Sequence, residues 1–403
     1  VRVVLLALAL AAPAAAASLL PGFRVERVAG SEGFVTSIAF DRHGNLYYSV
    51  TEGGIFRLEG ERSIRIATLP TASTGNAVLL GIAFRDDEIV AHYVTPDITA
   101  DIVAAVDPKT GEERELARFL CAGGSPCSTE HHGGNPIVGP DGTIWLGIGD
   151  YGVGLPAQLD GFTAGRIWRI PRDGEPEAFA RGFRNPYDLL LHPSGDYLIV
   201  GDNGSAGGDE IAFVREGENH GWPMTMGNEP AIDGMTPPAY VFPTTVAPTG
   251  MTLARDLVPN RTALLVGSYV PNTLFLFPDV DAAVLEPIPI LADLPQLGTF
   301  RSILDVVQAP TGEILFATPL AIWRLHLPLR GDVNGDGTVA GDDLEALAHE
   351  LVDGDGPAIT DIHLGEFAAT WGADVNEDAV VDSRDLVAWV LMQESRHRPV
   401  VRP

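Results

Sequence analysis

Two adjacent histidines, His131 and His132, follow Glu130 and open a glycine-rich stretch that ends at Asn135. An imidazole titrates near neutral pH and a nearby carboxylate can tune it, so this grouping is suited to general-base catalysis. Residues 139–142 and 143–148 have the pattern of a turn followed by a strand, which accounts for those residues but for neither histidine. A plain surface loop or a metal site is the alternative to catalysis.

Two cysteines, Cys121 and Cys127, lie six residues apart just before the histidines. In an exported protein such a pair predicts a disulfide rather than half of a metal site, although two cysteines this close can also stay reduced. A disulfide here would stiffen the loop that presents His131.

Two segments near the C-terminus repeat a pattern of oxygen-bearing side chains. Asp or Asn occupies positions 1, 3, 5 and 12 of each segment, which is the spacing of a calcium-binding loop, and position 7 of such a loop offers a backbone carbonyl. The expected ligands are Asp332, Asn334, Asp336, Thr338 and Asp343 in the first loop, and Asp374, Asn376, Asp378, Val380, Asp382 and Asp385 in the second. Gly337 suits the sharp turn of the first loop, whereas Ala340 and Ala379 depart from the pattern. A solvated acidic tail is the alternative, and it leaves the repeated spacing unexplained.

Charge and the N-terminal residues narrow the class of protein. The chain of 403 residues has a formal net charge of −28, and residues 331–395 hold 16 acidic side chains and one basic one. Nothing basic and clustered indicates nucleic-acid binding.

Residues 1–17 combine a charged start, a short apolar run and small residues, which is typical of a secretory signal cleaved after about Ala17. No other segment approaches ~20 uninterrupted apolar residues, so the sequence predicts a secreted (extracellular or periplasmic) protein without a membrane span.

One unit recurs between about residues 22 and 328: an apolar strand, a turn rich in Gly, Asp and Pro, a second strand and a third. Repeats of roughly 40–50 residues built of short strands are typical of a β-propeller, whereas a sandwich would have fewer and less similar units. About six units are present, so the predicted fold class is all-β, a six-bladed β-propeller. Loops on one face of a propeller converge on the central channel, where motifs from different blades can meet.

The character of the chain changes after residue 329. Each calcium-type loop runs into an apolar-periodic segment, which predicts a small α-helical domain over residues 330–395, followed by a tail at 396–403. This duplicated arrangement resembles a type I dockerin module, whose family role is to dock onto a cohesin-bearing partner. The recognition positions of that family are Gly341-Asp342 and Ser383-Arg384 here. Calcium binding is therefore a safer expectation than a cohesin-like partner.

Several motifs of the repeat region share the order and spacing of one family. They are His131-His132-Gly133-Gly134, Gly139-Pro140-Asp141-Gly142, Gly149-Asp150, Gly165-Arg166-Ile167-Trp168-Arg169-Ile170, Phe183-Arg184-Asn185-Pro186, Gly208-Asp209-Glu210-Ile211 and Gly217-Glu218-Asn219-His220-Gly221-Trp222-Pro223. Over about residues 30–327 the chain resembles the glucose/sorbosone dehydrogenase family, soluble quinoproteins on a six-bladed propeller that use pyrroloquinoline quinone (PQQ) and calcium. The resemblance implies oxidation of an aldose or related small sugar, with the electrons passing to an external acceptor.

The resemblance also implies roles for individual residues. His131 matches the general base that takes the proton of the anomeric hydroxyl, and Glu130 stands where the family has an acidic neighbour of that histidine. Asn76, Arg184 and Asn185 match cofactor contacts, and the Arg184 guanidinium suits a quinone oxygen that gains negative charge. The remaining positions, Gly204 and Ser205, match those whose backbone carbonyls hold a calcium ion that would polarise the quinone.

Two cationic positions of the best-studied branch differ in this chain. Val270 stands where that branch has a cofactor-binding lysine, and Ser302-Ile303-Leu304-Asp305 replaces an Arg-x-Arg-Asp motif, with Arg301 one place away. PQQ is a tricarboxylate, and burying its carboxylates without cations is costly. Arg301 could shift into place, or Tyr269 and Asn272 could hydrogen-bond instead.

The rival interpretation is a non-catalytic extracellular propeller that binds a glycan or a protein and is anchored through the dockerin-like module.

Overall fold

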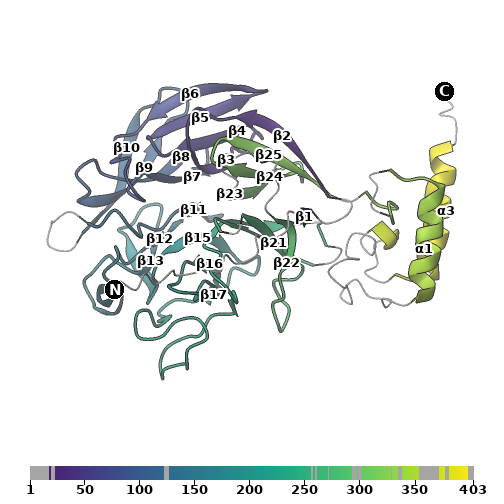
Figure 1. Cartoon of the computed structure of the whole chain (residues 1–403). Helices are drawn as coiled ribbons and strands as arrows, with labels where there is room; N and C mark the ends of the chain where they lie inside the picture. The colour runs from purple at the N-terminus through teal and green to yellow at the C-terminus, as the bar shows by residue number, and fades with distance from the viewer. Residues whose placement is uncertain are drawn as a thin grey trace, which may run out of the picture.

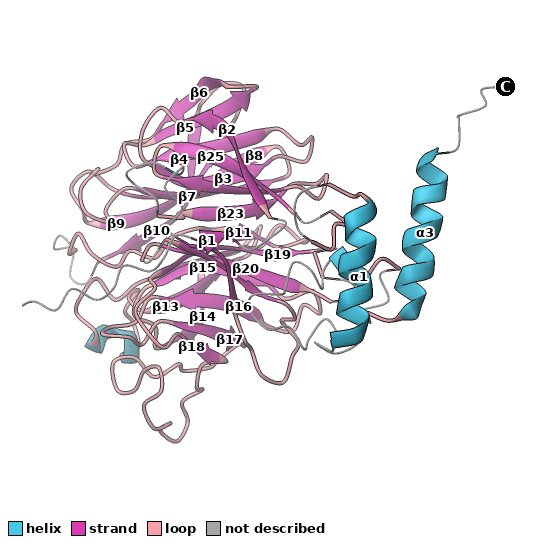
Figure 2. Cartoon of the chain, turned by 45° about the vertical axis from the view of Figure 1, so that its right-hand side comes forward, coloured by secondary structure: helices cyan, strands magenta, loops and turns pink. Residues whose placement is uncertain are grey.

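Each repeat of the sequence forms a separate antiparallel sheet, and the computed structural model contains six such sheets (Figures 1 and 2). The structure describes residues 18–19, 23–121, 127–255, 257–258, 261–270, 272–292, 297, 302–327, 329–334, 338–353, 372–376 and 381–397. Inner strands of neighbouring sheets pack against one another, except that the second strand of the third sheet makes the contact with the inner strand of the fourth, so the sheets close into a ring. The predicted six-bladed β-propeller is therefore confirmed.

The first three blades follow one another along the chain, each with its inner strand first. Blade 1 contains β3 (Val35–Phe40), β4 (Leu46–Val50), β5 (Gly54–Glu59) and β6 (Arg62–Thr68). Blade 2 contains β7 (Leu79–Arg85), β8 (Glu88–Val94), β9 (Ala100–Val106) and β10 (Glu113–Leu120). Blade 3 contains β11 (Ile137–Val138), β12 (Ile144–Ile148), β13 (Arg166–Ile170) and β14 (Glu177–Arg181), with the 3-10 helix η2 (Leu155–Gln158) between its second and third strands.

The last three blades complete the ring. Blade 4 contains β15 (Pro186–Leu191), β16 (Leu198–Asp202), β17 (Glu210–Val214) and β18 (Tyr240–Val241). Blade 5 contains β19 (Pro248–Ala254), β20 (Ala263–Ser268), β21 (Thr273–Phe277) and β22 (Ile288–Ala292). Blade 6 contains β23 (Asp305–Gln308), β24 (Ile314–Thr318) and β25 (Ala321–His326).

Strands from the beginning of the chain complete the last two blades. The strand β2 (Arg24–Gly30) pairs with β25 and forms the outer edge of blade 6, so the first and last parts of the propeller share one sheet. The short β1 (Ser18–Leu19) pairs with β22 as a fifth strand of blade 5. Strand pairing therefore begins before residue 22, where the sequence places the start of the propeller.

Apolar side chains are buried between neighbouring blades. Six buried clusters occupy the six blade-to-blade interfaces, for example Tyr47, Ile55 and Ile82 between blades 1 and 2. All residues of β4, β16, β20 and β24 are buried, because sheets cover these middle strands on both faces. This packing holds the loops at each end of the ring in register.

Two buried carboxylates join blades near the axis. Asp188 of β15 accepts a hydrogen bond from the amide of Met251 on β19, and Asp305 of β23 accepts one from the amide of Ile38 on β3 at 2.7 Å. Burial raises the pKa of both carboxyl groups, to about 7 for Asp305, and the charge of Asp305 adds to the effect on Asp188. Because burial removes their water, these carboxyl groups keep their protons to a higher pH than an exposed aspartate does.

The two ends of the inner strands define two faces of the ring. A cavity of about 970 Å³ lies among the inner strands, and its lining includes Arg42, Asp86 and Thr311 from the turns that follow those strands. The loops that precede the inner strands lie at the opposite ends and carry most of the motifs singled out in the sequence. The turns that line this cavity and the loops that carry the candidate chemistry are therefore on different faces.

In the described residues after the propeller, the helices α1 (Gly341–Asp353) and α3 (Ser383–His397) lie side by side next to it (Figures 1 and 2). Leu347, Trp389 and the loop residues Val333 and Val375 form their buried core. The helix α3 continues to residue 397, inside the predicted tail. None of the helices in the described ranges is long and apolar enough to cross a membrane. The predicted signal, residues 1–17, lies outside the described residues.

Candidate active site

The loops on one face of the ring bring His131, Asp150, Arg184 and Gly204 together from two blades. His131 and Arg184 precede the inner strands β11 and β15, whereas Asp150 and Gly204 follow the second strands β12 and β16. In an antiparallel blade the start of the first strand and the end of the second strand lie on the same face. Residues far apart in the sequence can therefore act on one ligand.

His131 and Asp150 form the central pair of this face. Nδ1 of His131 lies 2.6 Å from Oδ1 of Asp150, and the histidine side chain keeps 16% of its surface exposed. Because the carboxylate accepts at Nδ1, that nitrogen carries the proton and Nε2 keeps its lone pair. No described residue hydrogen-bonds Nε2. The exposed nitrogen is thus set up to accept a proton from a ligand.

Asp150 is buried and held by two further donors. The Gly152 amide donates to Oδ1 at 2.7 Å and the Trp222 indole donates to Oδ2 at 2.8 Å. Burial acts to raise the pKa of Asp150, but the hydrogen bonds from His131, Gly152 and Trp222 outweigh it and hold the pKa below its usual value. The carboxylate therefore stays ionised and can stabilise positive charge on His131.

The acidic partner of His131 is Asp150 and not Glu130, the neighbour that the resemblance implied. Glu130 is exposed, and it contributes its backbone amide to the Ser128 hydroxyl at 3.1 Å. In the sequence Asp150 stands out only as a member of the Gly149-Asp150 motif. The signal that marks it is the Gly149-Asp150 pair at the end of a buried strand, in the blade whose inner strand follows His131.

The backbone around the pair is closely packed. His131 has φ 55° and Tyr151 has φ 55°, the left-handed region that ordinary side chains avoid. The Asp150 amide donates to the Arg184 carbonyl at 2.8 Å. A Cβ on Gly149 would lie 2.2 Å from the His131 carbonyl oxygen, so only glycine allows this approach.

Arg184 and Asn185 have different surroundings. Nη1 of Arg184 donates to the carbonyls of Asn203 and Gly204 at 2.8 and 2.9 Å, and its guanidinium lies 5.8 Å from the centre of the Trp222 ring. Asn185 is buried, and its Oδ1 accepts the Gly133 amide at 3.0 Å. Asn185 thus anchors the histidine loop, while Arg184 stays beside the open part of the site.

Asn76 lies next to the histidine loop, but its link to that loop is through the backbone. The Asn76 amide donates to the Thr129 carbonyl at 2.7 Å, and its side chain is exposed. Arg301 lies outside the described residues. Tyr269 and Val270 are both about half exposed on the loop after β20.

The loop at Gly204 offers oxygen atoms that suit a hard cation. Its two predicted ligands are Gly204 and Ser205, and Oδ1 of the preceding Asn203 is buried without a hydrogen-bond partner among the described residues. The Asp209 carboxylate fixes the loop by accepting the Gly204 amide at 2.8 Å. A carbonyl oxygen has two lone pairs, so Gly204 can keep its bond to Arg184 and still face a cation. The donor set fits calcium.

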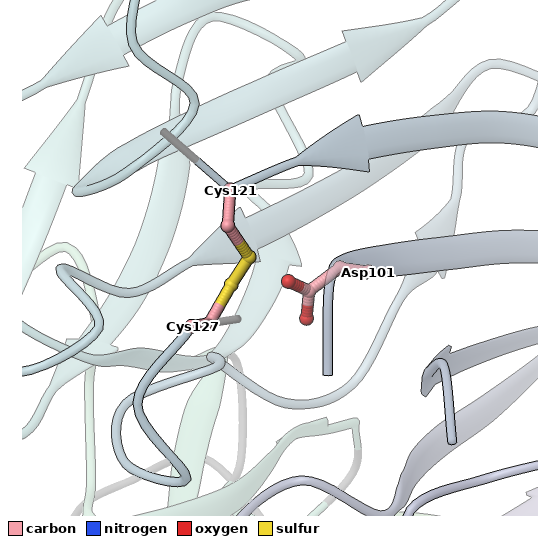
Figure 3. Close-up of side chains that lie close together, drawn as sticks. All are labelled: Asp101, Cys121 and Cys127. Atoms are coloured by element: carbon pink, nitrogen blue, oxygen red, sulfur yellow. A yellow bond between two sulfur atoms is a disulfide. The ribbon is translucent and has the colours of Figure 1, made fainter. Parts of the chain in front are cut away.

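The structure joins Cys121 and Cys127 in a disulfide, with the Asp101 carboxylate beside it (Figure 3). Both sulfur atoms are used in that bond, so this group is not a metal site. The amides of Cys121 and Cys127 donate to the carbonyls of Thr99 and Ile98 at 3.1 and 2.7 Å. The disulfide thus ties the start of the histidine loop to the residues before β9.

The two C-terminal loops share a backbone arrangement. Oδ1 of Asp343 accepts the Asn334 amide at 3.2 Å and Oδ2 accepts the Ala340 amide at 2.7 Å. In the second loop Asp385 accepts the matching amides of Asn376 and Asp382 at 3.0 and 2.8 Å.

The first-position residues Asp332 and Asp374 are buried, whereas the Asp382 carboxylate pairs with Arg384 at 2.7 Å. Of the other predicted calcium ligands, Thr338 lies within the described residues, and Asp336, Asp378 and Val380 lie outside them. The structure therefore repeats the loop geometry but describes only part of each predicted ligand set.

Comparisons with known proteins concern the propeller part of the chain. The sequence profile of the family described as Glucose / Sorbosone dehydrogenase matches residues 114–319, just over half of the chain. Quinoprotein glucose dehydrogenase B of Acinetobacter calcoaceticus is 30% identical over 197 residues, which cover 38% of this chain and 41% of that protein. The chain spans about half or less of the length of the curated relatives it matches.

Two solved structures share the fold. The soluble aldose sugar dehydrogenase of Escherichia coli in its apo-form has a TM-score of 0.64 and 18% identity, and the match covers 76% of this chain and 100% of that one. The PQQ-bound aldose sugar dehydrogenase of Streptomyces coelicolor has a TM-score of 0.63 and 21% identity, with 77% and 100% coverage. At these identities the likeness shows a common propeller and leaves the chemistry to the site residues.

Proposed function

Because this chain belongs to the glucose/sorbosone dehydrogenase family, we propose that it oxidises an aldose or related sugar with PQQ as cofactor and calcium at the site. The observation that carries this proposal is the His131–Asp150 pair, in which Nε2 of the histidine has no hydrogen-bond partner among the described residues. The electrons would then leave to an external acceptor.

The chain's own residues would handle the proton of the sugar hydroxyl. When bound, PQQ would supply the two-electron acceptor for the hydride of the sugar C–H bond. The hydroxyl proton would pass to Nε2 of His131 as the C–OH group becomes C=O. Asp150 would stabilise the resulting imidazolium, because its carboxylate already faces Nδ1 at 2.6 Å.

Other residues would hold the cofactor and the ion. The Arg184 guanidinium would face a quinone oxygen, and the oxygens of Gly204, Ser205 and Asn203 would hold calcium. Arg301, Tyr269 and Asn272 are the candidates for the carboxylates of PQQ. These residues fit calcium and the quinone oxygen well. For the carboxylates of PQQ, this chain offers fewer cationic side chains than the best-studied branch does.

The C-terminal module would bind calcium through its two loops and dock onto a partner outside the cell. The clasp made by Asp343 and Asp385 holds both loops in the same shape, which supports a duplicated calcium site. A cohesin-like partner is the expected class of receptor. The signal predicted at residues 1–17 would direct export.

One observation favours the rival, a propeller that binds a glycan or a protein without catalysis. Val270 is exposed and apolar where a lysine would hold the cofactor. A site that cannot bind PQQ would still present an arginine, a histidine and an aromatic ring, which suit a glycan.

Titration of the calcium-loaded protein with PQQ, followed by addition of aldoses, tests the proposal. We expect saturable binding, seen as a change in the quinone absorbance, and bleaching of that absorbance by the correct sugar. His131→Gln should keep PQQ binding and lose bleaching, whereas the exposed Asp107→Asn should behave as wild type. Absence of binding at micromolar PQQ would reject the dehydrogenase and leave the binding propeller.

A further inference from the structure

We propose that Asp101 is a positioning residue for the His131–Asp150 pair. Asp101 touches neither member of the pair. It accepts a hydrogen bond from the side chain that follows each member in the chain, His132 after His131 and Tyr151 after Asp150. The inference rests on the proposed function for its catalytic meaning and on the structure alone for its geometry.

The Asp101 carboxylate is the meeting point of three donors. It is the second residue of β9 and has no exposed surface. Nδ1 of His132 lies 3.0 Å from Oδ1, the Tyr151 hydroxyl lies 2.8 Å from Oδ2, and Nε2 of His92 lies 3.2 Å from Oδ1. A buried carboxylate that accepts several hydrogen bonds from charged or polar donors holds them in one geometry.

The imidazoles of His132 and His92 also contact the backbone of the histidine loop. Nε2 of His132 lies 2.8 Å from the Ser128 carbonyl, and Nδ1 of His92 lies 2.8 Å from the Gly134 carbonyl. Each ring therefore bridges Asp101 and one end of the segment 128–134, with His131 in the middle. The disulfide beside Asp101 ties the preceding residues to the same corner (Figure 3).

The backbone explains why the pair needs such a positioning residue, and we call Asp101 with its three donors the hub. His131 and Tyr151 both have φ near 55°, a conformation that costs free energy for a residue with a side chain. Backbone strain of this kind persists only where the surroundings over-determine it. The side chains of His132 and Tyr151 converge on one carboxylate, so Asp101 supplies that constraint to both strained segments at once.

The charge of Asp101 is part of the role. Both nitrogens of His132 face acceptors, so its ring is satisfied only as an imidazolium, which needs a buried negative charge nearby. An asparagine at 101 keeps the shape but loses the charge, and its NH2 group replaces one carboxylate oxygen. At least one of the three donors then faces N–H groups where it had an acceptor. The loops would then relax from the geometry that aligns Nδ1 of His131 with Asp150.

Three variants of the calcium- and PQQ-loaded full chain test the proposal. We expect Asp101→Asn to lower kcat roughly ten- to a hundredfold, because misplacing a catalytic group by about 1 Å has that effect. KM should change little, since Asp101 has no exposed surface. Tyr151→Phe, which removes one of the three donors, should lower kcat less. Asp107→Asn, an exposed aspartate just after the other end of β9, should match wild type.

Amide hydrogen exchange supplies a readout that does not depend on turnover. The Gly133 amide donates to Asn185 and the Gly152 amide donates to Asp150, so both report on the loops around the pair. We expect their exchange to be at least about tenfold faster in Asp101→Asn, with Tyr151→Phe between that variant and wild type.

The outcomes separate the hub from the proposed function. A wild type that oxidises no sugar defeats the proposed function, while faster exchange at Gly133 and Gly152 in Asp101→Asn still supports the hub. Wild-type kcat and wild-type exchange in Asp101→Asn overturn the hub. A raised KM with unchanged kcat, or a lower melting temperature with unchanged kcat, overturns it as well. If Asp101→Asn does not fold, Tyr151→Phe carries the same comparisons.

Discussion

Asp150 accepts hydrogen bonds from an imidazole, a backbone amide and an indole, while His131 has one acceptor at Nδ1. This difference separates the roles of the two residues. Three donors keep the Asp150 carboxylate ionised and fixed in position. It can therefore orient the His131 ring and stabilise a positive charge on that ring. The ring keeps one exposed nitrogen for exchange of a proton with a ligand.

At the scale of the residue, replacement of Asp150 by Asn should lower kcat by roughly a hundredfold or more, because the amide can leave His131 in the wrong tautomer. The far-UV spectrum and calcium binding should stay as in wild type. Asp141→Asn, at an exposed turn of the same blade, is the matched control. An Asp150→Asn enzyme with wild-type kcat would remove Asp150 from the mechanism.

The elements that carry the pair are loops, and their rigidity comes from links to strands. The disulfide between Cys121 and Cys127 closes a short loop, and the amides of both cysteines bond to Ile98 and Thr99 ahead of β9. The histidine segment begins immediately after it. Each of these contacts ties an irregular segment to the rigid edge of blade 2.

Replacement of both cysteines by serine should lower the free energy of unfolding by about 2 kcal/mol, the chain-entropy value for closing a loop of this length. Denaturant unfolding of the two proteins measures the difference. Reducing agent should change the wild type in the same direction and leave the double variant unaltered. Equal stability of oxidised and reduced wild type would contradict the expected role of the bond.

Each C-terminal helix follows a loop whose last acidic residue accepts hydrogen bonds from backbone amides of that loop. Asp343 has no exposed surface and accepts amides from both sides of its loop, while the adjacent Asp342 is exposed. If calcium fills the loop, its binding stabilises the helices by mass action, about 2.7 kcal/mol at a hundredfold excess over Kd.

Removal of calcium with a chelator should therefore lower the helical signal of the far-UV spectrum, because α1 and α3 lie in this module while the described part of the propeller is built mainly of strands. Asp343→Ala should lose most of the calcium response of the first loop, and Asp342→Ala should retain it. A helical signal that ignores both the chelator and the Asp343 substitution would reject calcium loading of this module.

At the scale of the whole molecule, the ring closes because β2 pairs with β25 and because buried carboxyl groups bridge neighbouring blades. Asp188 and Asp305 have raised pKa values owing to their burial, about 7 for Asp305. A carboxyl group whose folded pKa is raised binds its proton more tightly in the native state. Its contribution to stability is complete below the unfolded pKa and is lost as pH rises through the folded pKa.

The free energy of unfolding should thus contain a component that falls between about pH 4 and about pH 7. Asp305→Asn removes one of the titrating groups and should make that slope shallower, whereas Asp107→Asn should leave it unchanged. Urea unfolding at several pH values measures both slopes. A variant slope as steep as that of the wild type would show that Asp305 does not titrate in this window.

The number of blades and the candidate base could be predicted from the sequence, because both are recorded in local patterns. Alternating strands and Gly/Asp/Pro turns specify each blade by itself, and the His131 motif is contiguous. The pairing of Asp150 with His131 and the engagement of Asn185 with Gly133 could not be predicted, since each joins loops that only the packed blades bring together.

Asp101 shows the physical reason most plainly. It lies 31 residues before His132 and 50 before Tyr151, in a strand whose pattern marks it as one more buried position. Composition and periodicity determine that β9 is a strand of blade 2. The pairing of β8 with β9 brings the His92 imidazole to its carboxylate within blade 2. Only the packing of blade 2 against blade 3 adds the His132 imidazole and the Tyr151 phenol, because both belong to loops of the other blade.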